Sequence, residues 1–242
     1  MKIRSPAVAG RFYPADARGL EAEVRGHLAA AAPPRGGRPK GLIAPHAGYV
    51  YSGPVAGSAF RQLEPWRDSI ERVILLGPSH FVPFEGLALP SVQAFATPLG
   101  EVGVAGDAAT RLAGLPQTFV SDVAHGREHA LEVELPFLQV ALDRFELVPL
   151  VVGDASPEEV AEVLDRLWGG DETLIVVSTD LSHYRDYATA AGYVLSVLKR
   201  LPQEGEHFTD QDWRFEVVDM DGRKIDKLLV SPVVPKAASG AS

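Results

Sequence analysis

The stretch VILLGPSH, residues 73–80, is an apolar run that ends in a histidine. A short apolar run closed by Gly and Pro is typical of a strand that is buried on both faces. A second such run, GLIAP at 41–45, leads into His46. Open α/β sheets bind ligands beyond the carboxyl ends of their strands, and neutral imidazole is the commonest protein ligand for transition metals. The two runs therefore predict one site containing His46 and His80; the alternative is that each histidine only hydrogen-bonds a loop carbonyl.

The same alternation of strand and helix recurs along the chain. Strand-like runs also cover 146–152 and 172–178. Helical patterns follow Asp16, cover 54–63 and 130–142, and run from Ser156 to Trp168, where Ser-Pro-Glu-Glu forms a cap, a first-turn proline and a capping-box glutamate. Alternating strands and helices predict an α/β fold with a largely parallel sheet flanked by helices.

The pattern changes near residue 188. Residues 192–200 indicate a short helix, while 213–217 and 225–230 read as two strands joined by the turn dipeptide Asp221-Gly222. We therefore predict an α/β domain over 1–188, a smaller segment with a helix and a β-hairpin over 189–234, and a disordered tail over 235–242, with the boundary at 188–191.

Composition excludes several classes of function. The chain has 242 residues and a formal net charge of -9, and no cluster of Lys and Arg suits a nucleic-acid partner. No apolar run reaches the roughly 20 residues of a membrane span and no leader is evident, so we expect a cytoplasmic protein. Because there is no cysteine, any metal must rest on His, Asp, Glu or water. Composition does not indicate the oligomeric state.

A metal site can be assembled from the residues that follow the predicted strands. Fe(II) held by two imidazoles needs an anionic ligand as well, and Asp180 is the candidate. His183 is a candidate general acid or base, because an imidazole titrates near neutral pH. The alternative for this stretch is the N-terminus of a helix capped by Asp180 or Ser182.

A second polar group, His125-Gly126-Arg127-Glu128-His129, precedes the helical pattern at 130–142. The spacing of its two histidines resembles a zinc hydrolase, but the catalytic glutamate between them is missing, which disfavours a separate zinc site. We instead expect Glu128 and His129 to orient the ligating histidines. The alternative for Glu128 is an exposed ion pair with Arg127.

Hydroxyl groups beside the leading histidines are candidates for substrate binding. They belong to Tyr49, Tyr51 and Ser79, to which Ser182 is added from the later motif. Each could equally be a packing residue. The glycines after residue 47 do not meet the dinucleotide-binding pattern, and no Gly-x-Ser-x-Gly elbow is present.

From residue 1 to about 188 the chain resembles the Memo family, known in prokaryotes as AmmeMemoRadiSam system protein B. The motifs that carry the resemblance are RSPAVAGRFYP (4–14), APHAGYVYSG (44–53), LGPSHF (76–81), PLGE (98–101), EHALEV and LPF (128–133 and 135–137), and STDLSHY (178–184). That family is similar in fold to class III extradiol (LigB-type) dioxygenases. The resemblance implies that His46 and His80 are metal ligands and that His183 corresponds to the acid/base histidine of the dioxygenases.

The chain departs from this family in two ways. Memo proteins carry a cysteine where the dioxygenases have their third, carboxylate ligand, and this chain has none. Its later motifs, GYVL (192–195), RLP (200–202) and WRFEVVDMDGR (213–223), resemble the second half of the transporter-associated domain of CorC/HlyC proteins, which is linked to metal-ion efflux and has a flavin-binding-like fold. Two incomplete families in one chain suggest a chimera.

Three hypotheses of function follow. The first is a Memo-type metal protein with Fe(II) or copper and an oxidoreductase chemistry acting on a small molecule. The second is a non-catalytic module that binds a peptide or a small anion in the histidine-lined cleft. The third is a flavin-binding-like or efflux-associated role of the C-terminal segment, although we do not expect a bound flavin.

Overall fold

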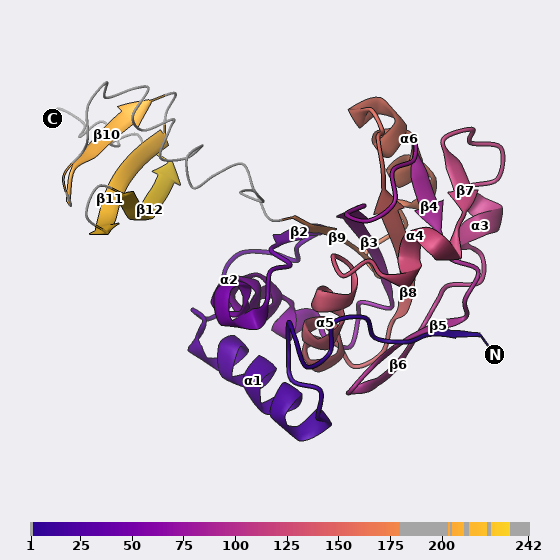
Figure 1. Cartoon of the computed structure of the whole chain (residues 1–242), viewed down its shortest axis with the longest axis horizontal. Helices are drawn as coiled ribbons and strands as arrows, with labels where there is room; N and C mark the ends of the chain where they lie inside the picture. Colours follow the sequence, from indigo (N-terminus) through magenta and orange to yellow (C-terminus); the bar gives the residue numbers. More distant parts are fainter. Residues whose placement is uncertain (1, 180–202, 204, 211–212, 222–223, 233–242) are drawn as a thin grey trace, which may run out of the picture. The chain divides into compact units, whose positions relative to one another are not determined.

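The computed structural model describes residues 2–179, 203, 205–210, 213–221 and 224–232. The chain divides into two units, Met1–Asp180 and Leu181–Ser242, which are described separately (Figure 1). The predicted boundary at 188–191, the predicted helix over 192–200 and the predicted tail over 235–242 lie outside the described residues.

The N-terminal unit is built around a six-stranded sheet. Its strands, in spatial order, are β2 (Gly41–Ala44), β9 (Thr173–Ser178), β3 (Arg72–Pro78), β8 (Glu146–Val152), β4 (Leu87–Leu89) and β7 (Thr118–Val120). Neighbouring strands are parallel except for the pair β4 and β8. The predicted α/β fold with a largely parallel sheet is confirmed. Parallel strands align their carboxyl ends at one edge of the sheet, and this places the ends of β2, β3, β8 and β9 together.

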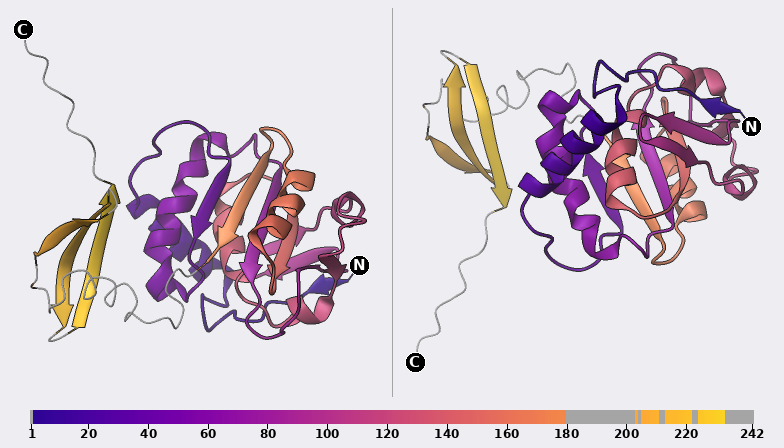
Figure 2. Two further views of the ribbon diagram at one scale, coloured as in Figure 1. Left: turned by 90° about the horizontal axis from the view of Figure 1, so that it is seen from above. Right: turned by 90° about the horizontal axis from the view of Figure 1, so that it is seen from below.

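Helices cover both faces of this sheet, as the two views of Figure 2 show. One face packs against α1 (Ala17–Ala30), α2 (Tyr49–Phe60) and α5 (Leu135–Ala141), and the other against α3 (Ala108–Arg111) and α6 (Pro157–Leu167). Side chains of β3 alternate between the two cores: Val73 and Leu75 belong to the first, Ile74 and Leu76 to the second. A strand buried on both faces needs an unbroken apolar run, which explains the sequence of β3.

Most predicted elements are confirmed, with corrections at helix ends. Asp16 caps α1 by accepting from the Gly19 amide, and the capping box of α6 is formed as predicted. The helix predicted over 54–63 begins earlier, at Tyr49, because the Gly48 carbonyl accepts the amides of its first turn, and Pro54 lies inside it. It also ends earlier, at Phe60, where the 3-10 helix η1 (Arg61–Trp66) follows. The helix predicted over 130–142 is shorter, since the 3-10 helix η2 (Glu132–Glu134) precedes α5.

A small second sheet holds the N-terminal segment against the core. It consists of β1 (Ile3–Arg4), β5 (Ala94–Thr97) and β6 (Gly100–Gly103). Arg4 is buried and paired with Glu132, whose two carboxylate oxygens also accept from three groups of the segment after β1. Those donors are the Ala7 and Val8 amides and the Tyr13 hydroxyl. The buried carboxylate thus ties the first 13 residues to the helical layer.

The described part of the C-terminal unit is an antiparallel sheet of β10 (His207–Asp210), β11 (Trp213–Asp221) and β12 (Lys224–Pro232). The pairing of β11 with β12 confirms the predicted hairpin, and both strands are longer than predicted. A register shift between Val217 and Met220 marks a bulge in β11. The sequence pattern did not reveal β10, which is short and half polar.

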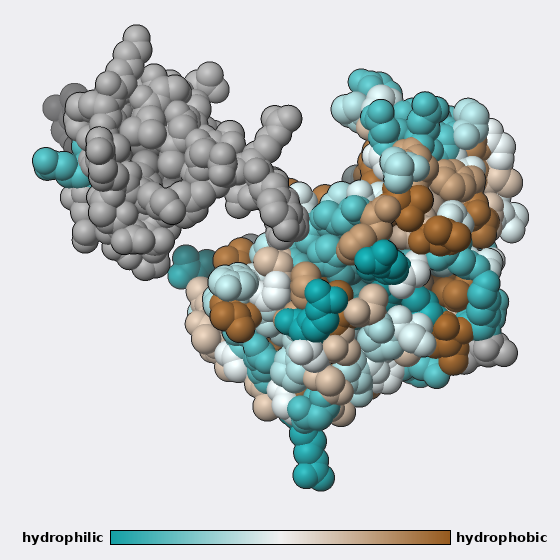
Figure 3. All heavy atoms as spheres, viewed as in Figure 1, coloured by the Kyte–Doolittle hydropathy of each residue, from teal (hydrophilic) through white to brown (hydrophobic). Residues whose placement is uncertain are grey.

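The surface of the N-terminal unit mixes polar and apolar side chains. In Figure 3, apolar side chains gather around β4, β7 and the short helix α4 (Asp122–Gly126), where Val120 and Val123 are exposed. Among the described residues, no helix is long and apolar enough to cross a membrane.

Candidate metal site

The two leading histidines lie at the carboxyl edge of the central sheet. His46 follows the end of β2 by two residues, and His80 follows the end of β3 by two residues. Their ring centroids are 5.2 Å apart and the rings meet edge to face. His46 is fully buried, whereas the side chain of His80 is 23% exposed. The apolar runs that the sequence shows thus end at one place, with one imidazole shielded and one reachable from solvent.

A third imidazole, His129, completes the cluster. Its ring centroid lies 4.5 Å from that of His80 and 5.6 Å from that of His46. One nitrogen of each of the three rings lies within 4.8 Å of the others. This spacing is compact enough for one metal ion to bind all three nitrogens. Because the residues all offer neutral nitrogen donors, the group suits a transition metal better than Ca²⁺ or Mg²⁺.

The carboxylate of Glu128 contacts two of the three histidines, His80 and His129. One oxygen, Oε2, accepts from the His80 amide at 2.7 Å, and the other, Oε1, lies 2.8 Å from His80 Nδ1 and 3.4 Å from His129 Nδ1. Oε1 also accepts from the amides of His129 and Ala130. Burial alone would raise the pKa of Glu128, but these hydrogen bonds from His80 and the backbone outweigh it and hold the pKa at about 2. The side chain is therefore a buried, ionised acceptor.

The carboxylate decides which nitrogen of His80 carries the proton. An ionised carboxylate can only accept, so Nδ1 of His80 must donate to it. In the neutral ring the lone pair is then on Nε2, the nitrogen that would bind a metal. Glu128 stands nearest Nδ1 of His129 as well, which favours the same tautomer there.

Ser178, the last residue of β9, has the same role for His46. Its hydroxyl lies 2.7 Å from the Ala130 carbonyl, 2.8 Å from Glu134 Oε1 and 2.9 Å from His46 Nδ1. The hydroxyl has one proton, and the carbonyl and carboxylate are acceptors. We therefore assign that proton to one of them, so that Nδ1 of His46 donates to the serine oxygen. All three rings then offer Nε2.

His125, four residues before His129, is not part of this cluster. It belongs to α4, which Ser121 caps, and its Nε2 bonds the Ala88 carbonyl at 2.9 Å inside the core. Burial lowers the pKa of His125 to about 4, so the ring is neutral at pH 7. The spacing that resembles a zinc hydrolase thus does not bring these two histidines to one ion.

The predicted hydroxyl residues lie in three different environments. Tyr49 is buried and donates its hydroxyl to the Val133 carbonyl at 2.8 Å, and burial raises its pKa. Tyr51 is exposed on α2. Ser79 donates to the Val82 carbonyl at 2.6 Å. Asp180, Ser182 and His183 lie outside the described residues.

Two aromatic rings flank His129, and the sequence analysis did not single them out. Phe12 meets its imidazole edge to face with the centroids 4.8 Å apart, and Phe81 does so at 5.9 Å. The guanidinium carbon of Arg127 lies 4.8 Å from the Phe81 centroid. The sequence contains signals for both, because Phe81 directly follows His80 and Phe12 lies in the first family motif.

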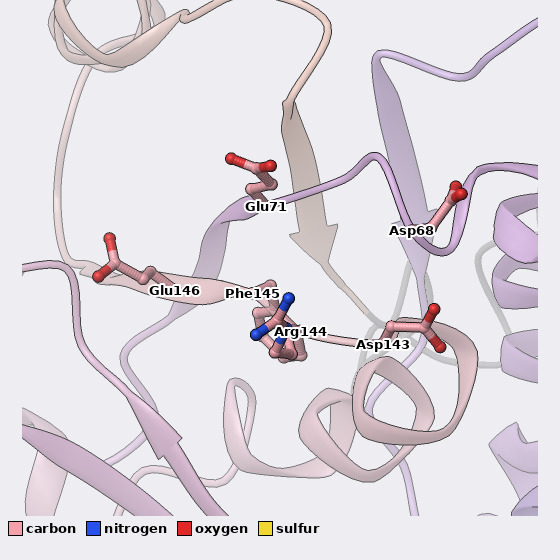
Figure 4. Close-up of a pocket in the computed structure, with 6 residues that line it drawn as sticks. All are labelled: Asp68, Glu71, Asp143, Arg144, Phe145 and Glu146. Carbon is pink, nitrogen blue, oxygen red and sulfur yellow. The ribbon is translucent and has the colours of Figure 1, made fainter.

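A hollow of about 360 Å³ lies at the opposite edge of the sheet, where β3 and β8 begin. Figure 4 shows its acidic side chains, of which Glu146 and Asp143 lie on opposite sides and do not converge. Asp143 pairs with Arg67 at 2.8 Å and Glu146 with Arg72 at 3.6 Å. Among the described residues, the histidine cluster is the group whose spacing suits a metal ion.

Taken together, the parallel sheet and the histidines at its carboxyl edge define an α/β protein with a candidate metal centre at the ligand-binding edge of the sheet. The sequence matches the family model described as Memo-like protein over residues 4–231. This chain belongs to the Memo family. The match continues beyond residue 188, where we expected the family resemblance to end. The resemblance of the later segment to a transporter-associated domain stays a prediction.

Similar proteins come from bacteria and archaea. A MEMO1 family protein of Aquifex aeolicus is 36% identical over 216 residues, which cover 86% of this chain and 79% of the relative. A MEMO1 family protein of Nitrosopumilus maritimus is 30% identical over 249 residues, which cover 99% of this chain and 84% of the relative. A MEMO1 family protein of Methanopyrus kandleri is 36% identical over 220 residues, which cover 82% of this chain and 75% of the relative.

Proposed function

We propose that this chain binds one redox-active metal ion, Fe(II) or copper, through Nε2 of His46, His80 and His129, and that it acts as a metal-dependent oxidoreductase related to the extradiol dioxygenases. The observation that carries the proposal is the convergence of three ring nitrogens within 4.8 Å. The assigned tautomers support it, since Glu128 and Ser178 take the Nδ1 protons and leave the lone pairs on the other nitrogens.

The donor set suits these metals. Imidazole binds Fe, Cu, Ni and Zn, and affinity for a given nitrogen site is greatest for copper. Three ligands leave coordination positions for oxygen or substrate, as in catalytic sites. When bound, the metal would supply the redox chemistry. The chain's own residues would orient the imidazoles and shield His46 from water.

The proposed site also includes Asp180 and His183, which lie outside the described residues. Asp180 follows Ser178 by two residues in the sequence. We propose Asp180 as an additional, anionic ligand that favours Fe(II), and His183 as the acid or base. Asp180→Asn should weaken Fe(II) binding at least about tenfold, and unchanged affinity would remove Asp180 from the ligand set.

Metal content after anaerobic loading tests the central claim. The full chain is loaded with Fe(II) or Cu(II), desalted and measured by mass spectrometry, in parallel with His129→Ala and with His46→Ala combined with His80→Ala. We expect one equivalent in the wild type, none in the double variant and at least about tenfold weaker binding in His129→Ala. His207→Gln, in the C-terminal unit, is the matched control and should keep the metal. Equal metal in wild type and double variant would refute the site.

Oxygen consumption then separates an oxidoreductase from a metal-binding protein without redox activity. The Fe(II)-loaded chain is screened with catechol-like substrates in an oxygen-electrode assay. Substrate-dependent uptake that is lost in His129→Ala supports the enzyme. Full metal occupancy without uptake for any catechol tested would count against dioxygenase chemistry and leave the metal site standing.

A further inference from the structure

The side chain of Arg127 is placed to receive a negative charge beside the histidine cluster. Arg127 is exposed and lies over the Phe81 ring, with 4.8 Å from the guanidinium carbon to the ring centroid. Within the part of the chain that the structure describes, no carboxylate forms an ion pair with it. A guanidinium that stacks through its flat face keeps its N–H donors free along its edge.

Among the described residues, the carboxylate of Glu128 forms no ion pair with the guanidinium of Arg127. Glu128 is turned into the protein, with its side chain 1% exposed, and its charge is satisfied by the His80 ring and by backbone amides. The ion pair of Arg127 with Glu128, which the sequence allowed, is therefore not part of the structure. Among the described residues Arg127 therefore has no counter-charge, on a chain whose net charge is -9.

The location of this cation ties it to the candidate metal site. The ring against which it stacks lies 5.9 Å from the His129 ring and 6.4 Å from the His80 ring, centroid to centroid. The Phe81 ring thus lies close to both the guanidinium and the imidazoles. His129 also meets Phe12, so two aromatic rings adjoin the cluster. A ligand that fits here has a flat apolar body and an anionic end.

We propose that Arg127 determines ligand specificity by binding the carboxylate of a small aromatic acid, whose ring packs against Phe81 and whose far end reaches the histidine cluster. The proposal rests on the proposed metal site for the ligand's far end. Arginine is suited to the task because its fork of donors matches the two oxygens of a carboxylate. Phe81, 45% exposed, offers a ring that contacts the ligand and is otherwise costly to leave in water.

Calorimetric titration with benzoate tests the proposal. Benzoate is titrated into the full chain, metal-free and loaded with Co(II), and is compared with benzamide, which has the same shape without the charge, and with acetate, which has the charge without the ring. We expect benzoate to bind more tightly than either. Arg127→Gln should weaken benzoate binding about tenfold, the loss expected for a charge-assisted pair, while Arg127→Lys should lose less.

Two controls make the loss specific. Arg18→Gln removes the same charge from an exposed position of α1 and should leave benzoate binding unchanged. Co(II) affinity, measured from its absorption spectrum, should be the same in Arg127→Gln and in the wild type, because the residue touches no metal-binding nitrogen. Phe81→Ala should weaken benzoate more than acetate.

The outcomes separate this proposal from the metal site. Benzoate binding that Arg127→Gln leaves intact, or benzamide binding as tight as benzoate binding, overturns the proposal. Normal Co(II) binding with no benzoate binding overturns it too and leaves the metal centre standing. Benzoate binding that depends on Arg127 in a chain that binds no Co(II) would support the carboxylate site and refute the metal centre.

Discussion

Replacing Glu132 with glutamine should strongly destabilise the N-terminal unit, because this carboxylate is the anchor of the first 13 residues. The side chain is fully buried and its partner Arg4 is 5% exposed. Oε2 accepts from Arg4 Nη1 and the Ala7 amide, each at 2.7 Å, and Oε1 accepts from the Val8 amide at 3.0 Å and the Tyr13 hydroxyl at 2.6 Å. Glutamine keeps the shape but turns one of these oxygens into a donor.

The cost follows from the contacts. Whichever oxygen is replaced, two donors lose their acceptor, at about 1–2 kcal/mol for each donor that is buried. Arg4 also loses its counter-charge and keeps neutral carbonyls, of Ser5, His125 and Glu128, as hydrogen-bond partners. Breaking a buried ion pair by removing one member costs about 3–5 kcal/mol in total. For a unit of this size that loss lowers the melting temperature by roughly 6–20 °C.

Calorimetry and urea unfolding of the full chain at pH 7 measure the effect. Glu101→Gln, at an exposed position of β6, is the matched control and should change stability by no more than about 0.5 kcal/mol. A loss below about 1 kcal/mol in Glu132→Gln would refute this reasoning.

Three further predictions concern packing, pH and the metal. Gly57→Ala should lower the free energy of unfolding by about 1–3 kcal/mol in urea, because the new Cβ would lie 2.7 Å from the backbone oxygen of His27. Gly26→Ala on α1 meets open space and should raise this free energy by about 0.5–1 kcal/mol. Equal effects of the two substitutions would contradict this packing. Burial lowers the pKa of His125 from 6.5 to about 4, so this residue contributes roughly 3 kcal/mol of stability above pH 6.5 that is lost as the pH falls towards 4. The free energy of unfolding should therefore fall less across this range in His125→Gln than in the wild type. An identical pH dependence in the two proteins would contradict the buried, neutral state of His125. Ser178→Ala should weaken metal binding about tenfold in a Co(II) titration, since the acceptor that fixes one imidazole is removed; unchanged affinity would argue against the assigned tautomer.

The sequence predicts the sheet well because the relevant signals are local. A strand buried on both faces must be apolar along its whole length, and a helix cap needs particular residues at fixed offsets. β3 and α6 show these patterns and occur where they were predicted. The start of α2 was predicted wrongly because Gly48 and the loop before it carry no capping side chain. Its first amide, that of Tyr49, donates to the Phe12 carbonyl, which is distant in sequence.

The candidate site could be predicted only in part for the same reason. His46 and His80 follow strands, so sheet topology alone brings them to one edge. His129 follows a five-residue helix, and no periodic pattern indicates where that helix lies. Its position depends on Glu128, which binds the His80 amide 48 residues away. Such a contact is a property of the folded chain.

Arg127 and Glu128, which are adjacent in the sequence, therefore have different roles. Glu128 is buried and its hydrogen bonds reach His80, His129 and Ala130 together, so the arrangement of the imidazoles cannot be separated from its charge. Arg127 is exposed, contacts Phe81 and makes no hydrogen bond to the cluster among the described residues. A change at Arg127 can thus alter which ligand binds without moving the histidines. A change at Glu128 must alter the histidines themselves, and any loss of ligand binding that follows would be indirect.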